Sequence, residues 1–315
     1  MSEAPAGVPA AGTSLVLRGR EVGRGADGAL RPVVMAIVNR TTDSFYAPAR
    51  QPDEGAALAA AHQAWEDGAQ ILDVGGVRAG VGPEVDEAEE IARVVPFVAR
   101  LREQVPDLLV SVDTWRAAVA REVVAAGADL VNDTWAGHDP ALVEVAGAAG
   151  VGVVCSHTGG AVPRTDPYRV EYPPDARAGG DPRDGVLDDV VATLREAAAR
   201  AVACGVPPRS VLVDPTHDFG KNTWHSLHLL RRTEALAGLG YPLLMALSRK
   251  DFVGETLGLG PDERLEGTLA ATALAAWMGA SVFRTHDVVA TRRVLDLVAV
   301  VRDDAPPYAV LRGLA

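Results

Sequence analysis

Short runs of apolar residues alternate along this chain with longer stretches in which apolar residues recur at helical spacing. Uninterrupted apolar runs are typical of strands buried on both faces of a parallel sheet. They occur at residues 33–38, 71–72, 108–112, 130–131, 152–154, 211–213, 243–247 and 282–283. The stretches with helical periodicity follow them, at residues 52–67, 84–103, 116–126, 140–149, 185–203, 223–239, 265–278 and 288–301. The pattern therefore predicts consecutive strand–helix units along the whole chain.

A glycine separates helix from strand in most of these units, and this regular punctuation supports a repeated architecture. Glycine can take the left-handed conformation that often ends a helix. The positions are Gly68, Gly127, Gly150, Gly205, Gly240 and Gly279. The repetition favours an α/β fold of the (β/α)8 TIM-barrel type in a single domain. A doubly wound open sheet is the alternative, but the Gly-x-Gly-x-x-Gly turn expected after its first strand is absent.

The domain limits follow from where the regular pattern starts and stops. We expect the barrel to span residues 13–305, with a short hairpin near residues 14–18 before the first barrel strand. Residues 1–12 are rich in Ala, Pro and Gly and are expected to be disordered, and residues 306–315 to form a C-terminal tail. The Pro- and Gly-rich loop at about residues 158–184 is long for a barrel connection, which marks it as a candidate functional segment.

The composition of the chain limits the kinds of molecule that it is expected to bind. The chain has 315 residues, 48% of them hydrophobic, and a net charge of −12. Lys and Arg are scattered, so no basic stripe is expected to bind nucleic acid. Residues 1–12 lack the features of a signal peptide, and Gly279 divides the uncharged stretch 267–283, so no membrane segment is expected. Cys155 and Cys204 lie in apolar surroundings, which is typical of reduced thiols in a cytoplasmic protein.

Polar residues follow the predicted strands at the point where each strand ends. In a (β/α)8 barrel the carboxyl ends of the strands form the active site. The candidate site residues are therefore Asn39, Asp73, Asp113, Asn132, His157, Asp214, Ser248, Arg249, Lys250, Arg284 and His286.

These candidates divide into two chemical groups. Asp113, Asn132 and Asp214 can accept hydrogen bonds from a ligand edge that carries several N–H groups. An anion could be held by Arg249, Lys250, Arg284 and His286. Asn39 could supply an oxygen to a hard metal ion held mainly by phosphate. A heterocycle that bears a phosphate group would satisfy both groups.

A metal-dependent hydrolase is a weaker interpretation of the same strand ends. It would use His157, His217, Asp218 and His286. The paired His-x-His that would present two imidazoles together on the first strand is absent from the sequence.

Several strand ends carry sequences that resemble motifs of the dihydropteroate synthases. Asn39-Arg-Thr-Thr-Asp-Ser-Phe45 resembles the Asn-Val-Thr-Pro-Asp-Ser-Phe signature of that family. Further motifs follow in the family's order: Asp73-Val-Gly-Gly76, Ser111-Val-Asp-Thr114, Val131-Asn-Asp133, Asp214-Pro with Phe219-Gly-Lys221, Leu247-Ser-Arg-Lys250, and Arg284-Thr-His-Asp-Val288. The resemblance extends over about residues 15–300.

The resemblance implies a cytoplasmic, homodimeric barrel of folate biosynthesis. Such a barrel joins a dihydropterin diphosphate to p-aminobenzoate and releases diphosphate. By this resemblance, the pterin would be held by Asp113, Asn132, Asp214 and Lys250. The diphosphate would be held by Asn39, Arg284 and His286, with Mg²⁺ at Asn39. The p-aminobenzoate would lie beside Phe219, Ser248 and Arg249, and further loop contacts are expected from Asp43, Ser44, Arg78 and Lys221.

The sequence also departs from the family's motifs in three places. The second loop normally reads Gly-Gly-Glu-Ser-Thr-Arg-Pro-Gly, but residues 75–80 are shorter and read Gly-Gly-Val-Arg-Ala-Gly. Thr42 replaces the proline of the first loop. Thr216-His-Asp218 replaces a Gly-x-Gly turn beside the expected pterin carboxylate. The pattern resembles a divergent group of paralogues within the family.

Three hypotheses remain from the sequence. The first is a dihydropteroate synthase-type transferase, and the intact pair Arg284 and His286 favours it. The second is a catalytically inactive paralogue that binds pterin or serves as a partner or regulatory protein, which the altered second loop favours. The third is another pterin-barrel enzyme, such as a methyltetrahydrofolate-dependent methyltransferase, which would not need the two residues of the diphosphate site.

Overall fold

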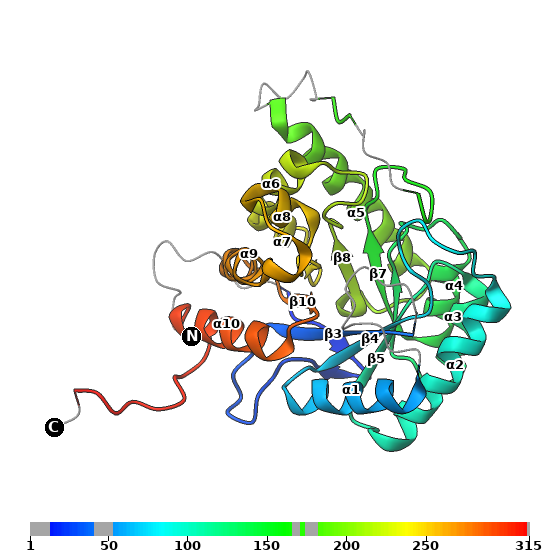
Figure 1. Cartoon of the computed structure of the whole chain (residues 1–315), viewed down its shortest axis with the longest axis horizontal. Helices are drawn as coiled ribbons and strands as arrows, with labels where there is room; N and C mark the ends of the chain where they lie inside the picture. The colour runs from blue at the N-terminus through cyan, green and yellow to red at the C-terminus, as the bar shows by residue number, and fades with distance from the viewer. Residues whose placement is uncertain (1–12, 41–52, 166–170, 174–181, 314–315) are drawn as a thin grey trace.

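The computed structural model describes residues 13–40, 53–165, 171–173 and 182–313, and in it parallel strands form a barrel surrounded by helices (Figure 1). Its strands are β3 (Val33–Asn39), β4 (Ile71–Gly75), β5 (Leu109–Asp113), β6 (Leu130–Asp133), β7 (Gly152–Ser156), β8 (Val211–Asp214), β9 (Leu244–Met245) and β10 (Val282–Thr285). They pair in the order β8-β7-β6-β5-β4-β3-β10-β9. A parallel bridge between Val213 and Leu243 joins the two ends of this sheet. The predicted (β/α)8 barrel is therefore confirmed, and the open doubly wound sheet is excluded.

Helices follow the strands and cover the outside of the barrel. Their bounds are α1 (Glu54–Glu66), α2 (Glu87–Gln104), α3 (Ala117–Ala125), α4 (Leu142–Ala149), α5 (Gly185–Ala203), α6 (Thr223–Arg231), α7 (Thr233–Ala237), α8 (Asp251–Leu257), α9 (Leu265–Trp277) and α10 (Val288–Val301). Short 3₁₀ turns lie at Pro182–Asp184, Pro208–Ser210 and Pro261–Glu263. Several helices start at a residue whose side chain accepts a hydrogen bond from the first turn, as at Asp53, Asp86 and Asn222. Such caps satisfy backbone donors that have no partner within the helix.

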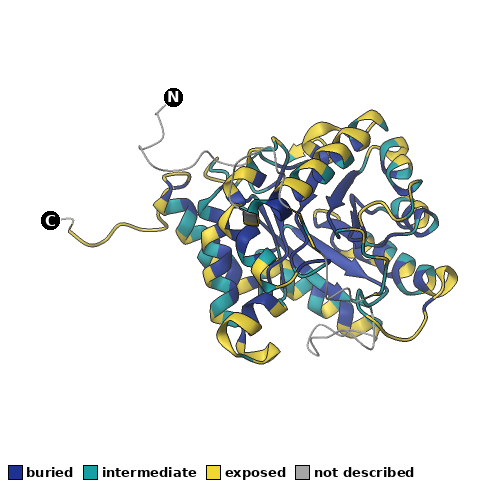
Figure 2. Cartoon of the chain, turned by 90° about the horizontal axis from the view of Figure 1, so that it is seen from above, coloured by how far each residue is buried: buried dark blue, intermediate teal, exposed yellow. Residues whose placement is uncertain are grey.

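The core has two layers, one on each side of the barrel sheet. The strands are buried throughout most of their length, whereas the helices carry exposed residues on their outer sides (Figure 2). The larger layer lies between the outer face of the strands and the apolar faces of the helices. The smaller layer fills the barrel interior with residues such as Met35, Ile71 and Leu130. The antiparallel hairpin of β1 (Val16–Leu17) and β2 (Arg20–Glu21) contributes to this inner layer. The predicted hairpin therefore packs against the inner core of the barrel.

Three elements differ from the sequence prediction. The predicted helix 223–239 is two helices, because the buried Thr233 donates its hydroxyl to the carbonyl of Leu230 at 2.8 Å and the chain turns there. Such a side-chain bond competes with the helical backbone pattern. The predicted strand 243–247 is shortened to β9, and α8 was not predicted at all.

The structure describes neither residues 1–12 nor residues 314–315. The predicted disorder of residues 1–12 falls outside the described residues. Residues 306–313 run away from the barrel beyond α10 (Figures 1 and 2). Within the described part of the chain, no helix is both long and apolar enough to cross a membrane.

Candidate functional site

A buried carboxylate, Asp73 on β4, connects side chains from β5, β6 and β10 at the mouth of the barrel. Its Oδ1 accepts a hydrogen bond from Ser111 on β5 at 2.6 Å. Its Oδ2 accepts one from Asn132 on β6 at 3.1 Å and one from the Arg284 guanidinium on β10 at 2.6 Å. Asp73 is fully shielded from solvent. The sequence placed Asp73 at a strand end, but the resemblance assigned it no ligand, and the structure shows that it organises the site.

Asp113 is the second carboxylate of this cluster. Its Oδ2 lies 3.1 Å from Nη2 of Arg284, and its Oδ1 accepts a hydrogen bond from Thr134. Burial raises the pKa of the Asp113 carboxyl to about 7, even though Arg284 acts in the opposite direction. Arg284 is thus shared between two carboxylates, and the formal charge of the three groups is −1. This part of the mouth favours a ligand edge with N–H donors.

The opposite side of the mouth is built from Asp214 and two lysines. Asp214 ends β8 and accepts a hydrogen bond from the backbone N–H of Thr216 at 2.7 Å. Burial raises the pKa of the Asp214 carboxyl, against the pull of Lys250 and Lys221. Asp214 therefore presents a second buried acceptor across the mouth from Asp113.

Lys221 and Lys250 make different contacts. The Lys221 ammonium is buried and donates to the carbonyls of His157 at 2.8 Å, Phe219 at 2.9 Å and Thr216 at 3.2 Å. Lys221 therefore fixes the loop after β8 from within, and burial lowers its pKa to about 7. Lys250 donates to the carbonyl of His217 at 2.9 Å and lies 4.4 Å from the centre of the Phe219 ring.

Two residues of the Thr216–Asp218 turn, which replaces the family's Gly-x-Gly, take unusual backbone conformations, and the turn also binds α8. Thr216 and Asp218 have φ values of 52° and 71°. The Asp218 carboxylate accepts hydrogen bonds from the backbone of Asp251, at 2.7 Å, and of Phe252 at the start of α8. His217 is fully buried, and burial lowers its pKa to about 3.

The residues after β9 and β10 separate into two groups. Ser248 lies 3.0 Å from Nδ1 of His286, so these two predicted site residues are together. Burial lowers the pKa of His286 to about 3, which keeps the imidazole neutral at physiological pH. Arg249, by contrast, binds Asp287 through two nitrogens at 2.9 and 3.0 Å and donates to the carbonyls of Pro261 and Asp262. The Arg249 guanidinium therefore binds the 3₁₀ turn before α9 and the residue that precedes α10.

The structure describes the loop after β4 but little of the loop after β3. Asn39 ends β3 beside Gly75, where a Cβ would come within 2.9 Å of the Asn39 side-chain oxygen. Arg78 lies in the partly exposed second loop. Asp43 and Ser44 fall outside the described residues.

The donor groups of the mouth fit a metal ion only in part. Among the residues that the structure describes, no group of three or more His, Cys, Asp or Glu could hold a metal ion. Asn39 supplies one neutral oxygen, so an Mg²⁺ ion there would depend on phosphate oxygens of a ligand and on water. The four residues of the hydrolase alternative do not form such a group. His157 binds Asp189, Asp218 binds α8 and His286 binds Ser248. Neither ring nitrogen of the buried His217 has a hydrogen-bond partner among the described residues.

Known proteins resemble this chain over most of its length. A family model described as "Pterin binding enzyme" matches residues 35–286. An inactive dihydropteroate synthase 2 of Mycobacterium leprae (strain TN) is 59% identical over 285 residues, which cover 90% of this chain and 96% of that protein. The dihydropteroate synthase of Bacillus subtilis (strain 168) is 36% identical, over 85% of this chain and 88% of that enzyme.

Solved structures show the same likeness. A Yersinia pestis dihydropteroate synthase in a sulfonamide complex has a TM-score of 0.81 at 33% identity, over 93% of this chain and 100% of that chain. A Coxiella burnetii dihydropteroate synthase in complex with pteroic acid has a TM-score of 0.77 at 31% identity, over 92% of this chain and 98% of that chain. The matching family model and the barrel fold define a pterin-binding type of protein. The chain belongs to the dihydropteroate synthase family, as a divergent member.

Proposed function

We propose that this protein is a catalytically inactive dihydropteroate synthase paralogue that binds a pterin at the mouth of its barrel. Asp113, Asn132 and Asp214 lie at the ends of three strands, and their oxygens match the N–H groups of an aminopyrimidine edge. Lys250 lies on the same side as Asp214 and would contact the pterin ring. The inactive relative from Mycobacterium leprae supports this proposal over retained synthase activity.

One observation carries the proposal: the divergent turn after β8 engages Lys250, a cationic group expected to act on the substrates. Arg284 is paired with Asp73 and Asp113. Lys250 is held by the carbonyl of His217, which belongs to the divergent turn. Departure of diphosphate needs positive groups directed at the developing charge. Because Asp73, Asp113 and Arg284 lie in motifs shared with the family, the divergent turn that holds Lys250 is the feature that sets this chain apart. We therefore expect pterin binding to survive better than catalysis.

Mg²⁺ and p-aminobenzoate enter this proposal as secondary ligands. An Mg²⁺ ion at Asn39 would screen the charge of a pterin diphosphate, with Arg284 and His286 close to the same phosphates. The half-buried Phe219 and the buried Ser248 would form the side that faces p-aminobenzoate. The shorter second loop, with Arg78, offers fewer contacts to that aryl amine than the family motif does.

Diphosphate release tests the inactive assignment directly. The purified protein would be given hydroxymethyl-dihydropterin diphosphate, p-aminobenzoate and Mg²⁺, with the Bacillus subtilis synthase as the positive control. We expect no release above the uncatalysed rate. Release by this protein that Asp214→Asn abolishes would establish the transferase instead, because the same carboxylate would then be required for turnover.

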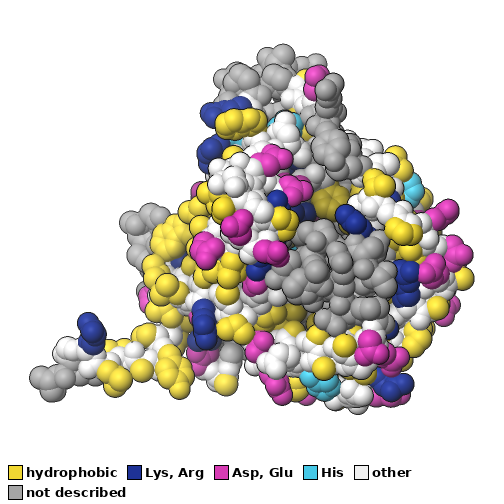
Figure 3. Space-filling view, viewed as in Figure 1, with side chains coloured by type: hydrophobic (Ala, Val, Ile, Leu, Met, Phe, Trp, Pro, Cys, Tyr) yellow, Lys and Arg dark blue, Asp and Glu magenta, His cyan; other side chains and the backbone are white. Residues whose placement is uncertain are grey.

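We also propose that the protein forms a homodimer through α8, α9 and α10. Large apolar side chains are exposed on these helices, namely Leu257, Leu274, Leu297 and Val301. Apolar side chains gather on this side of the surface, whereas Lys and Arg lie dispersed among Asp and Glu (Figure 3). Exposed apolar patches of this kind often mark protein–protein contacts.

A further inference from the structure

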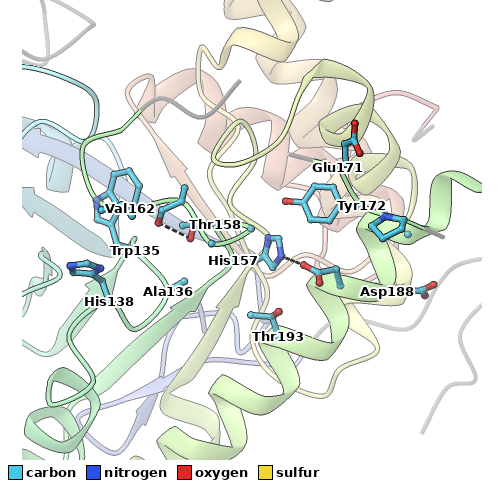
Figure 4. Close-up of a pocket in the computed structure, with 16 residues that line it drawn as sticks. Trp135, Ala136, His138, His157, Thr158, Val162, Glu171, Tyr172, Asp188 and Thr193 are labelled. Atoms are coloured by element: carbon cyan, nitrogen blue, oxygen red, sulfur yellow. Dashed lines mark hydrogen bonds and ion pairs between the residues drawn. The ribbon is translucent and has the colours of Figure 1, made fainter. Parts of the chain in front are cut away.

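A cavity of about 650 Å³ opens beside the barrel mouth, on the outer side of the loops that follow β6 and β7 (Figure 4). Its walls come from those two loops, from residues 171–173 and from α5. The pterin-site residues Asp113, Asn132, Asp214, Lys250 and Arg284 are not among the described residues that line it. The volume lies within the range of cavities that hold small organic ligands. The cavity is therefore separate from the proposed pterin site and large enough for a second ligand.

Among the described residues that line the cavity, every Asp, Glu, Lys or Arg side chain is an acid. Glu171, Asp188 and Asp189 line the cavity, and no Lys or Arg side chain is among the described lining residues. Asp189 bonds Nε2 of His157 at 2.7 Å, while half of its side chain stays exposed. Burial lowers the pKa of His157 to about 4, so the imidazole is neutral at physiological pH and does not cancel the Asp189 charge.

The buried imidazole of His157 also leaves one polar atom without a partner. His157 is only 1% exposed, and its Nδ1 has no hydrogen-bond partner among the described residues. With Nε2 directed at Asp189, a neutral imidazole donates there and keeps Nδ1 as an acceptor. The dyad thus holds Asp189 in place at the cavity wall.

Two aromatic side chains, Trp135 and Tyr172, also line the cavity, and each is held by a neighbouring residue. Trp135 is buried and contacts the Phe219 ring edge-on with a centroid distance of 5.2 Å. The Tyr172 hydroxyl donates to the carbonyl of Gly220 at 2.7 Å. A Cβ at Gly185 would come within 2.5 Å of the Tyr172 carbonyl, so a glycine at the start of α5 allows the 171–173 segment to pack closely. The cavity is therefore a built feature, with rigid aromatic faces beside carboxylates.

We propose that this cavity binds a small organic cation, with its ammonium or amidinium group at Asp188 and Asp189 and its flat or apolar body between Trp135 and Tyr172. Carboxylates attract the cation directly, and the faces of aromatic rings add a further electrostatic attraction. The proposal does not depend on pterin binding. Trp135 also packs against Phe219, which lies at the barrel mouth. A ligand in this cavity would therefore contact Trp135 on the side that faces away from the mouth.

Benzamidine and its neutral analogue benzamide test the charge requirement. Calorimetry on the full-length protein would measure both, together with the double variant Asp188→Asn/Asp189→Asn. The matched control is Glu196→Gln, since Glu196 is an exposed carboxylate on the same helix outside the cavity. We expect wild type and Glu196→Gln to bind benzamidine alike, and the double variant to lose at least about tenfold in affinity.

A steric variant tests the location. Thr193 lines the cavity from α5, and Thr193→Trp would fill it without changing a carboxylate. We expect this variant to lose benzamidine binding while its melting temperature and circular dichroism stay those of the wild type. Binding of benzamide as tight as that of benzamidine, unchanged affinity in the double variant, or no benzamidine binding at millimolar concentration would each overturn the proposal.

Discussion

At the scale of single residues, the site depends on which acids are charged at working pH. Asp73 accepts hydrogen bonds from Arg284, Ser111 and Asn132. Burial raises the pKa of the Asp113 carboxyl to about 7, so this group titrates near neutral pH. An Asp whose pKa is raised on folding stabilises the protein most below its unfolded pKa, and that contribution is lost as the pH rises through about 7. The affinity for a ligand should instead increase as the pH rises, because the N–H donors of the ligand bind the deprotonated carboxylate.

A pH series of pterin binding follows from this. We expect the affinity for pteroic acid to fall as the pH drops below about 7, by up to about tenfold per pH unit. The variant Asp113→Asn should bind more weakly and lose most of this dependence, which calorimetry between pH 6 and 8 would measure in about half-unit steps. A wild-type profile that stays flat across this range would show that Asp113 does not meet the ligand.

Sequence reasoning found most of the residues at the mouth, because strand ends of a barrel converge on one place. It placed Asp113, Asn132, Asp214 and Lys250 there, and the structure brings them together. It gave no partner to Asp73, because an ion pair between β4 and β10 joins residues far apart in the chain. Arg249 lies between the site residues Ser248 and Lys250 in sequence, but its side chain is directed toward Asp287. Its positive φ of 55° allows this direction, which the sequence motif does not predict.

At the scale of elements, apolar runs located the barrel strands and helical spacing located the long helices. The helix α8 was missed because it is short and because its first turn is capped from another loop. Asp218 reaches from the turn after β8 to the backbone N–H groups of Asp251 and Phe252. No local sequence pattern predicts a contact between residues this far apart in the chain. The divergent turn therefore links the mouth of the barrel to α8.

Substitution of Asp218 tests this link. The variant Asp218→Gly keeps the positive φ but removes the acceptor, and we expect it to cost about 1 kcal/mol of unfolding free energy. Amide hydrogen exchange in residues 251–257 should become faster than in the wild type. The matched variant Asp218→Asn keeps both an acceptor and tolerance of this φ and should stay close to the wild type. Equal exchange in all three proteins would contradict the cap.

At the scale of the whole molecule, the exposed apolar helices predict an oligomer. Sedimentation velocity should show a dimer for the wild type, and Leu274→Asp with Leu297→Asp should shift it toward monomer. Val81→Asp is the control, because Val81 is also an exposed apolar residue but lies in the second loop. A wild-type protein that sediments as a monomer at micromolar concentration would remove the basis for the dimer.

Pterin binding by the intact protein is the measurement that tests the account most directly. Calorimetry with pteroic acid would compare the wild type with Asp214→Asn, which keeps the shape of the side chain, and with Asp67→Asn on the surface beyond α1. We predict binding by the wild type and by Asp67→Asn, and a loss of at least about tenfold for Asp214→Asn. No binding by the wild type, or equal binding by Asp214→Asn, would contradict a pterin site at the mouth of this barrel.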